Sequence, residues 1–165
     1  EDANAPSPLA ELRDAQARAS FGPNTGMAVT IDIGDAENVH PRNKQDVGKR
    51  LALLALKQAY GKEIVANGPL MKSLHVEGNT VRIRFKNTDG GLRTTDGAGP
   101  RGLAVAGEDN VFHWANARLD GDEVVLTCEL APNPHHVRYA WADNPDCNLN
   151  NGAGLPCGPF QAKLK

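Results

Sequence analysis

The pattern of apolar residues changes its period near residue 66, and this change most constrains the fold. Before it, two segments repeat apolar side chains at helical spacing around one short apolar run, residues 27–33. After it, apolar and polar residues alternate between turn-forming clusters of Gly, Asn and Asp. A chain of 165 residues is long enough for one good core or two small domains. The sequence therefore predicts an α/β segment over residues 1–65 and an all-β domain over residues 66–165.

The α/β segment is expected to hold two helices and one buried strand. Ser7-Pro8 is a helix start signal, so a first helix should cover residues 9–20. Residues 27–33 have the length of a buried strand, with Asp32 as the one charge. Asn43 can cap a second helix that ends near Tyr60. The apolar stripe of this helix, which is expected to pack on a sheet, is Val47, Leu51 and Leu54.

The all-β domain is expected to consist of short antiparallel strands. Hairpin turns are predicted at Glu77-Gly78-Asn79 and at Asp120-Gly121-Asp122, and residues 89–102 are predicted to form a long exposed loop. Strands at this spacing favour an antiparallel β-sandwich. The predicted strands cover residues 69–76, 80–85, 103–106, 111–119, 124–130, 137–142 and 160–164.

His40 is the candidate functional residue. It follows the apolar run 27–33 and an acidic loop, and it precedes a helix, where open α/β folds place functional groups. Imidazole, with an ordinary pKa of about 6.5, can take and return a proton near neutrality. A catalytic histidine also needs a partner for its second nitrogen, and Glu37 and Asp35 lie three and five residues upstream. The simpler interpretation is that His40 only ends a loop before Pro41.

The same stretch resembles a known family. TIDIGDAENVHPRNKQDVGKRLA is similar to the histidine-bearing block of the sialate O-acetylesterase family, a branch of the SGNH/GDSL hydrolases. WADNPDCNLNNGAGLPCGPF resembles the closing segment of that family, and LAELRDAQ and PNTGMAVTIDIG resemble its preceding blocks. The resemblance implies that His40 is the catalytic base of a serine esterase and that residues 1–65 belong to an SGNH-type α/β hydrolase domain. Gln16, within the matching LRDAQ, would then lie near the site, or else face solvent.

The resemblance also implies a substrate and a missing part. The family removes O-acetyl groups from sialic acid or related acetylated sugars through an acyl-enzyme, without a metal or other cofactor. The Gly-Gln-Ser-Asn segment that carries the family's nucleophilic serine does not occur here, nor do its upstream oxyanion donors. This chain is therefore expected to be the C-terminal part of such an enzyme, and its partner a chain or segment that carries the serine.

Glu37 departs from the superfamily pattern, which commonly has Asp three residues before the histidine. The group that orients His40 is therefore open between Glu37, Asp35, a backbone carbonyl and no partner at all. Glu37 remains the candidate second catalytic residue, and no substrate-binding residue is assigned.

Composition excludes several classes of partner. A formal charge of −2 and a pI near 6.2 argue against nucleic-acid binding, and no apolar run approaches the roughly 20 residues of a membrane span. The chain begins with Glu1 rather than methionine, so we expect either a removed signal peptide or a cut from a longer precursor. Because the family is often secreted, a secreted or periplasmic location is expected.

Three cysteines leave two interpretations open. Cys147 and Cys157 flank a loop rich in Asn and Gly, so a disulfide between them is expected, with two unrelated thiols as the alternative. Cys128 lies in a strand-like run and is expected to be a buried, inert thiol. The spacing of the cysteines does not predict a zinc site.

Two other functions remain as alternatives. The aromatic residues Phe112, Trp114, Tyr139 and Trp141 could form a platform for sugar rings, which would make the chain a non-catalytic carbohydrate-binding β-sandwich module. Aromatic residues at alternate strand positions are more often part of a core. The last alternative is a structural fragment without activity.

Overall fold

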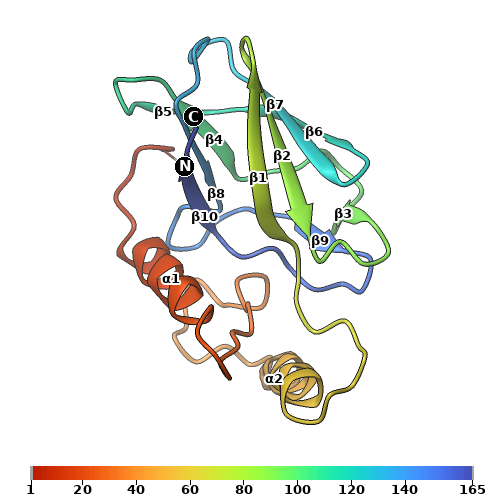
Figure 1. The fold of residues 1–165 in the computed structure, drawn as a ribbon. Coiled ribbons are helices and arrows are strands. Elements are labelled where there is room, and N and C mark those ends of the chain that lie inside the picture. The colour runs from red at the N-terminus through yellow and green to blue at the C-terminus, as the bar shows by residue number, and fades with distance from the viewer. Residues whose placement is uncertain (1, 165) are drawn as a thin grey trace.

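The computed structural model describes residues 2–164, which contain two helices followed by ten strands (Figure 1). The helices and their connections occupy one end of the molecule, and the strands form the rest (Figure 1). In chain order the elements are α1 (Pro8–Ala19), α2 (Lys44–Gln58), β1 (Leu70–Glu77), β2 (Thr80–Lys86), β3 (Leu92–Thr94), β4 (Leu103–Ala106), β5 (Phe112–Trp114), β6 (Asn116–Asp120), β7 (Glu123–Thr127), β8 (His136–Tyr139), β9 (Leu149–Asn151) and β10 (Phe160–Lys163).

The strands form two four-stranded antiparallel sheets with the orders β1-β2-β7-β6 and β10-β8-β4-β5, and β3 pairs with β9. The prediction of antiparallel sheets is therefore confirmed. Alternate side chains of both four-stranded sheets meet in one apolar core, because every second residue of a strand points to the same face. Its members include Val81, Ile83, Val124 and Leu126 from the first sheet, and Leu103, Val105, Val137 and Tyr139 from the second.

The predicted single strand 111–119 is wrong, because the chain changes sheet in its middle. β5 pairs with β4 in one sheet, whereas β6 pairs with β7 in the other. Ala115, between them, donates its backbone N–H to the carbonyl of Leu103 at 3.0 Å. The pairing of β3 with β9 was not predicted, because both strands are short and lie in Gly- and Asn-rich sequence.

Both helices and their caps are confirmed. The Ser7 hydroxyl accepts a hydrogen bond from the N–H of Ala10, and the Asn43 side chain accepts one from the N–H of Asp46. The predicted apolar stripe of α2 is only partly right. Leu54 is buried, but Leu51 is 52% exposed, because the described residues place no sheet beneath it.

The expected buried strand 27–33 is not present. Residues 27–30 carry no strand assignment and are half-buried, and residues 31–33 form a turn in which Ile33 donates to the carbonyl of Thr30 at 3.2 Å. A strand exists only through hydrogen bonds to a neighbour. Within residues 2–164 no strand pairs with this segment, although its composition suits one.

The expected Cys147–Cys157 disulfide is also absent, since Cys128, Cys147 and Cys157 are free thiols. Burial raises the pKa of the Cys147 thiol to about 11 and raises that of Cys157 even further. Both thiols therefore stay protonated near neutral pH, which makes them poor nucleophiles. Cys128 is buried, as predicted.

Polar contacts tie residues 1–65 to the sheets. The Ser7 hydroxyl donates to the Asp143 carboxylate at 2.6 Å, and Arg13 donates to the carbonyls of Ala142 and Asp143 at 2.8 Å each. The closing turn at Asp143 therefore packs against the helical part. Neither helix that the structure describes has the length and apolarity needed to cross a membrane.

The connection between α2 and β1 is packed tightly at Gly68. A Cβ atom added there meets the carbonyl oxygen of Pro156 at 2.0 Å, whereas one added at Gly48 in α2 meets nothing within 4 Å. We expect Gly68→Ala to lower the free energy of unfolding by about 1–3 kcal/mol, because backbone atoms must move. Gly48→Ala should raise it by about 0.5–1 kcal/mol, because glycine is a poor helix former. Urea denaturation measures both changes, and equal effects of the two substitutions contradict the packing at Gly68.

Candidate active site

The loop that carries His40 is built from local turns. The Asp35 carboxylate accepts the N–H of Glu37 at 3.0 Å, and the side chain of Asn38 accepts the N–H of His40 at 2.8 Å. Short polar side chains that bond the backbone two residues ahead stabilise such turns without a sheet or helix. They present His40 at the surface, three residues before Asn43, the cap of α2.

The structure does not join His40 to an acidic partner. His40 and Glu37 are both exposed, and among the described residues no hydrogen bond or ion pair links their side chains. The carboxylate of Asp35 is used by the backbone of the loop. The role of Glu37 therefore stays a prediction, as does that of His40.

A cavity of about 550 Å³, here called the loop cavity, lies beside the histidine loop. Glu37 and Asn38 line it from the loop, Gln16 lines it from α1, and Asn144 lines it from the closing turn. His40 itself is not among the lining residues, but its neighbours Val39 and Pro41 are. The structure therefore brings Gln16 and Glu37 to one cavity, with His40 at its margin.

Arg50 on α2 anchors the segment that leads into this loop. Its side chain is almost fully buried and donates to both carboxylate oxygens of Asp32, at 2.6 and 2.7 Å, and to the carbonyl of Val29 at 2.6 Å. A guanidinium that binds a carboxylate through two parallel bonds fixes orientation as well as distance. Sequence reasoning missed this pair, although a lone Asp in an apolar run was a signal for it.

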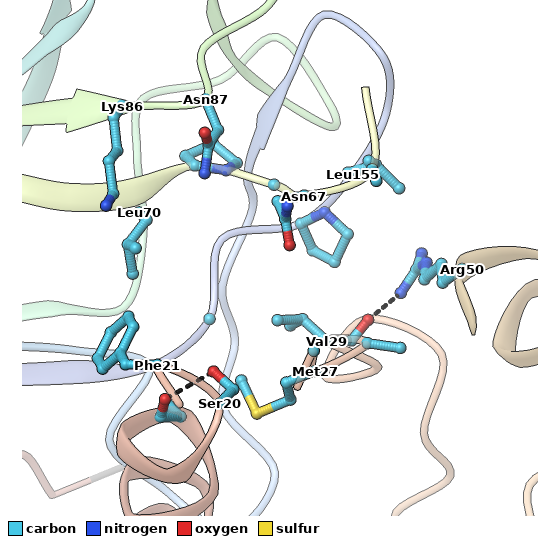
Figure 2. Close-up of a pocket in the computed structure, with 18 of the residues that line it drawn as sticks. Ser20, Phe21, Met27, Val29, Arg50, Asn67, Leu70, Lys86, Asn87 and Leu155 are labelled. Atoms are coloured by element: carbon cyan, nitrogen blue, oxygen red, sulfur yellow. Dashed lines mark hydrogen bonds between the residues drawn. The ribbon is translucent and has the colours of Figure 1, made fainter. Parts of the chain in front are cut away.

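A second cavity, of about 330 Å³, also borders this segment (Figure 2). Met27 and Val29 line it together with Phe21 and Asn67, and Figure 2 shows Arg50 reaching from α2 to the carbonyl of Val29. Met27, Ala28 and Val29 line both cavities. This segment is therefore bordered by open space and is not packed inside a layer.

The chain is 44% identical over 156 residues to a sialate O-acetylesterase of Rattus norvegicus, which covers 86% of the chain. A sialate O-acetylesterase of Mus musculus is 46% identical over 59 residues. The crystal structure of a carbohydrate acetylesterase from Xanthomonas citri matches 97% of the chain with a TM-score of 0.92 and 40% identity. The chain is sialate O-acetylesterase-like. The family resemblance in the sequence is thereby confirmed, and no family model matches.

The match spans only part of each relative. The sialate O-acetylesterase-like chain covers 29% of the rat protein and 37% of the Xanthomonas citri chain.

The sequence of this chain holds three serines. Ser7 caps α1, Ser20 donates to the carbonyl of Ala17 at 2.7 Å, and Ser73 lies on β1. None of the three has a hydrogen bond to His40 in the structure.

The aromatic residues do not form the suggested sugar platform. Phe112, Tyr139 and Trp141 are buried, and only Trp114 on the edge strand β5 is exposed. The interpretation as core residues is therefore right for three of the four.

Among the described residues, no group of three or more His, Cys, Asp or Glu side chains is arranged to hold a metal ion.

The anchor at Arg50 predicts a measurable loss of stability. We expect Asp32→Asn to lower the free energy of unfolding by about 1–3 kcal/mol, because it leaves a buried guanidinium without its counter-charge. Asp14→Asn is the matched control, since Asp14 pairs with the exposed Arg18 within α1 at 2.8 Å and such pairs contribute only about 0.3–0.5 kcal/mol. Urea denaturation compares the two, and a loss at Asp32 no larger than at Asp14 contradicts the anchoring role.

Proposed function

We propose that the chain is the C-terminal part of a serine carbohydrate esterase that removes O-acetyl groups from sialic acid or related acetylated sugars. The observation that carries the proposal is the 44% identity to a rat sialate O-acetylesterase across 86% of the chain. The Xanthomonas citri relative, a carbohydrate acetylesterase, supports the same reaction class. Under this proposal residues 1–65 belong to an SGNH-type hydrolase domain and residues 66–165 form a β-sandwich.

His40 is the general base in this proposal. Its imidazole takes the proton of a serine hydroxyl on another segment while the serine oxygen attacks the acetyl carbonyl. The same imidazole then gives the proton to the departing sugar oxygen, which leaves an acetyl-serine. Water, deprotonated by His40, releases acetate and restores the serine. The exposed position of His40 beside the loop cavity supports this role, because an incoming serine and substrate have access to it.

The serine-bearing segment is proposed to dock on the helical end of the molecule. Seven of the ten exposed large apolar side chains in the described residues lie before residue 61, which is little more than a third of the chain. Exposed apolar side chains gathered in one region mark an interaction surface. They are Leu9, Leu12, Phe21, Val39, Leu51, Leu56 and Tyr60.

The unpaired segment 27–30 supports the same docking site. Its sequence suits a strand, its backbone has no neighbouring strand in residues 2–164, and its residues line two cavities. A strand from the serine-bearing segment, with its helices, can pair with this edge and cover Leu12 and Phe21. The relatives are about three times as long as the match, so they contain enough additional chain for such a layer.

A chimera tests the catalytic proposal. The matched region of the Xanthomonas citri enzyme is replaced by this chain, and hydrolysis of p-nitrophenyl acetate and of O-acetylated sialic acid is measured. We expect activity, and we expect His40→Ala to lower kcat by about 10²–10⁴-fold, the usual contribution of a general base. His75→Ala, at an exposed histidine on β1, is the control and should leave kcat unchanged. An active chimera that keeps its kcat in His40→Ala rejects His40 as the base.

The same chimera tests the docking surface. Phe21 is 67% exposed in this chain, so Phe21→Asp should leave the stability of the isolated chain unchanged. In the chimera, Phe21→Asp should lower the free energy of unfolding by about 2 kcal/mol, because there a buried aromatic side chain is replaced by a charge. Leu130→Asp, at a side chain that is 73% exposed and far along the sheets, should leave both proteins unchanged. If Phe21→Asp shifts the melting temperature of the isolated chain and of the chimera equally, the proposed docking surface is contradicted.

A further inference from the structure

The outer face of the sheet β10-β8-β4-β5 gathers positive charge. His136 and Arg138 alternate along β8, and the register places Lys163 of β10 opposite His136 and Gln161 opposite Arg138. Because neighbouring strands keep paired residues on the same face, these four side chains share one face of the sheet. Val137 and Tyr139, which lie between them in sequence, point into the core.

A cleft of about 420 Å³, here called the cationic cleft, opens over these side chains. Arg18 borders it from the end of α1, and Asn110 borders it from the turn before β5. The lining contains three cationic side chains, one histidine and two amides, and it contains no Asp or Glu. The volume falls in the range of small-molecule sites, about 300–1,000 Å³.

Arg138 is held in place but keeps its hydrogen-bonding capacity. Its guanidinium carbon lies 3.8 Å from the centre of the Phe112 ring and 5.2 Å from that of Trp141. Its Nε donates to the side-chain oxygen of Gln161 at 3.3 Å. Among the described residues, its two terminal nitrogens have no acceptor and no carboxylate lies within ion-pair distance of it. A half-buried guanidinium that is fixed by aromatic rings and lacks a counter-charge is prepared to bind an anion.

The electrostatics of the cleft agree with this geometry. Burial lowers the pKa of His136, and the positive charges of Lys163, His135 and Arg138 lower it further. Burial lowers the pKa of Arg138, and the negative charge of Glu11 on α1 acts in the opposite direction. Asp14, also on α1, pairs with Arg18. The balance at the cleft remains positive in a chain whose formal net charge is −2.

We propose that the cationic cleft binds an acidic sugar through its carboxylate. The terminal nitrogens of Arg138 and the ammonium group of Lys163 donate to the carboxylate, and the amides of Gln161 and Asn110 donate to or accept from sugar hydroxyls. The cleft is large enough for a monosaccharide and offers neutral amides as well as cations, which favours a sugar over a bare inorganic anion. This site does not depend on the proposed esterase mechanism, since none of these residues lines the loop cavity.

Titration of the 165-residue chain at low ionic strength tests the site. N-acetylneuraminic acid, which carries a carboxylate, is compared with neutral N-acetylmannosamine and with inorganic sulfate, and amide shifts are followed by NMR. We expect the acidic sugar to bind at least tenfold more tightly than the neutral sugar and to displace sulfate. The shifts should gather at residues 136–138 and 161–163. Equal binding of both sugars, no binding of the acidic sugar at millimolar concentration, or sulfate binding that the acidic sugar does not displace each overturn the proposal.

Matched substitutions locate the site. Arg138→Gln and Lys163→Gln should each weaken the acidic sugar at least fivefold, and Arg138→Lys should restore only part of the loss because it keeps the charge without the planar fork. Lys163 is exposed, so its substitution leaves the fold intact even where that of Arg138 does not. Arg118→Gln and Lys72→Gln, at exposed positions of the other sheet, should leave the affinity for the acidic sugar unchanged. Unchanged affinity in Lys163→Gln, or equal losses in all four glutamine variants, overturns the assignment.

Discussion

The buried guanidinium of Arg50 holds the helical end of the molecule together. Segments without regular structure of their own normally keep their place through hydrogen bonds to neighbouring strands, and within the described residues 2–164 no strand pairs with residues 27–30. The bonds from Arg50 to Asp32 and Val29 take over that function and fix the segment to α2. The histidine loop then runs from this anchor to the cap of α2, so its two ends are fixed by the same helix. The position of His40 therefore follows from an ion pair rather than from a sheet.

Local signals in the sequence were sufficient for much of the fold. The caps at Ser7 and Asn43 and the glycine turn at Gly78 act within a few residues, and the structure has α1, α2 and the β1–β2 hairpin where these signals place them. The errors lie where the outcome depends on distant partners. Whether residues 27–33 form a strand depends on a neighbour, and the break at Ala115 depends on two separate sheets. Alternation of side chains alone carries no information about either.

In the candidate site, too, local features could be predicted from the sequence and contacts between distant residues could not. His40 was proposed because its local context is distinctive, and its role stays a prediction. The resemblance to the family of the relatives is confirmed. The Arg50–Asp32 pair joins residues 18 positions apart, and the cationic cleft joins β8, β10 and α1. Such groups become visible only after the chain has folded, because no short motif contains them. Glu37 belongs to neither group, since it lies near His40 in sequence but no hydrogen bond or ion pair among the described residues joins the two side chains.

The interleaved order of the two four-stranded sheets has a consequence for folding. β1 and β2 begin one sheet, β4 and β5 begin the other, and the chain then returns to the first sheet for β6 and β7 before it completes the second with β8 and β10. Neither sheet is a continuous piece of sequence, so neither can fold as an independent unit. Contacts between residues far apart in sequence slow folding, because long loops must close first. The shared core therefore stays incomplete until β10 has paired with β8.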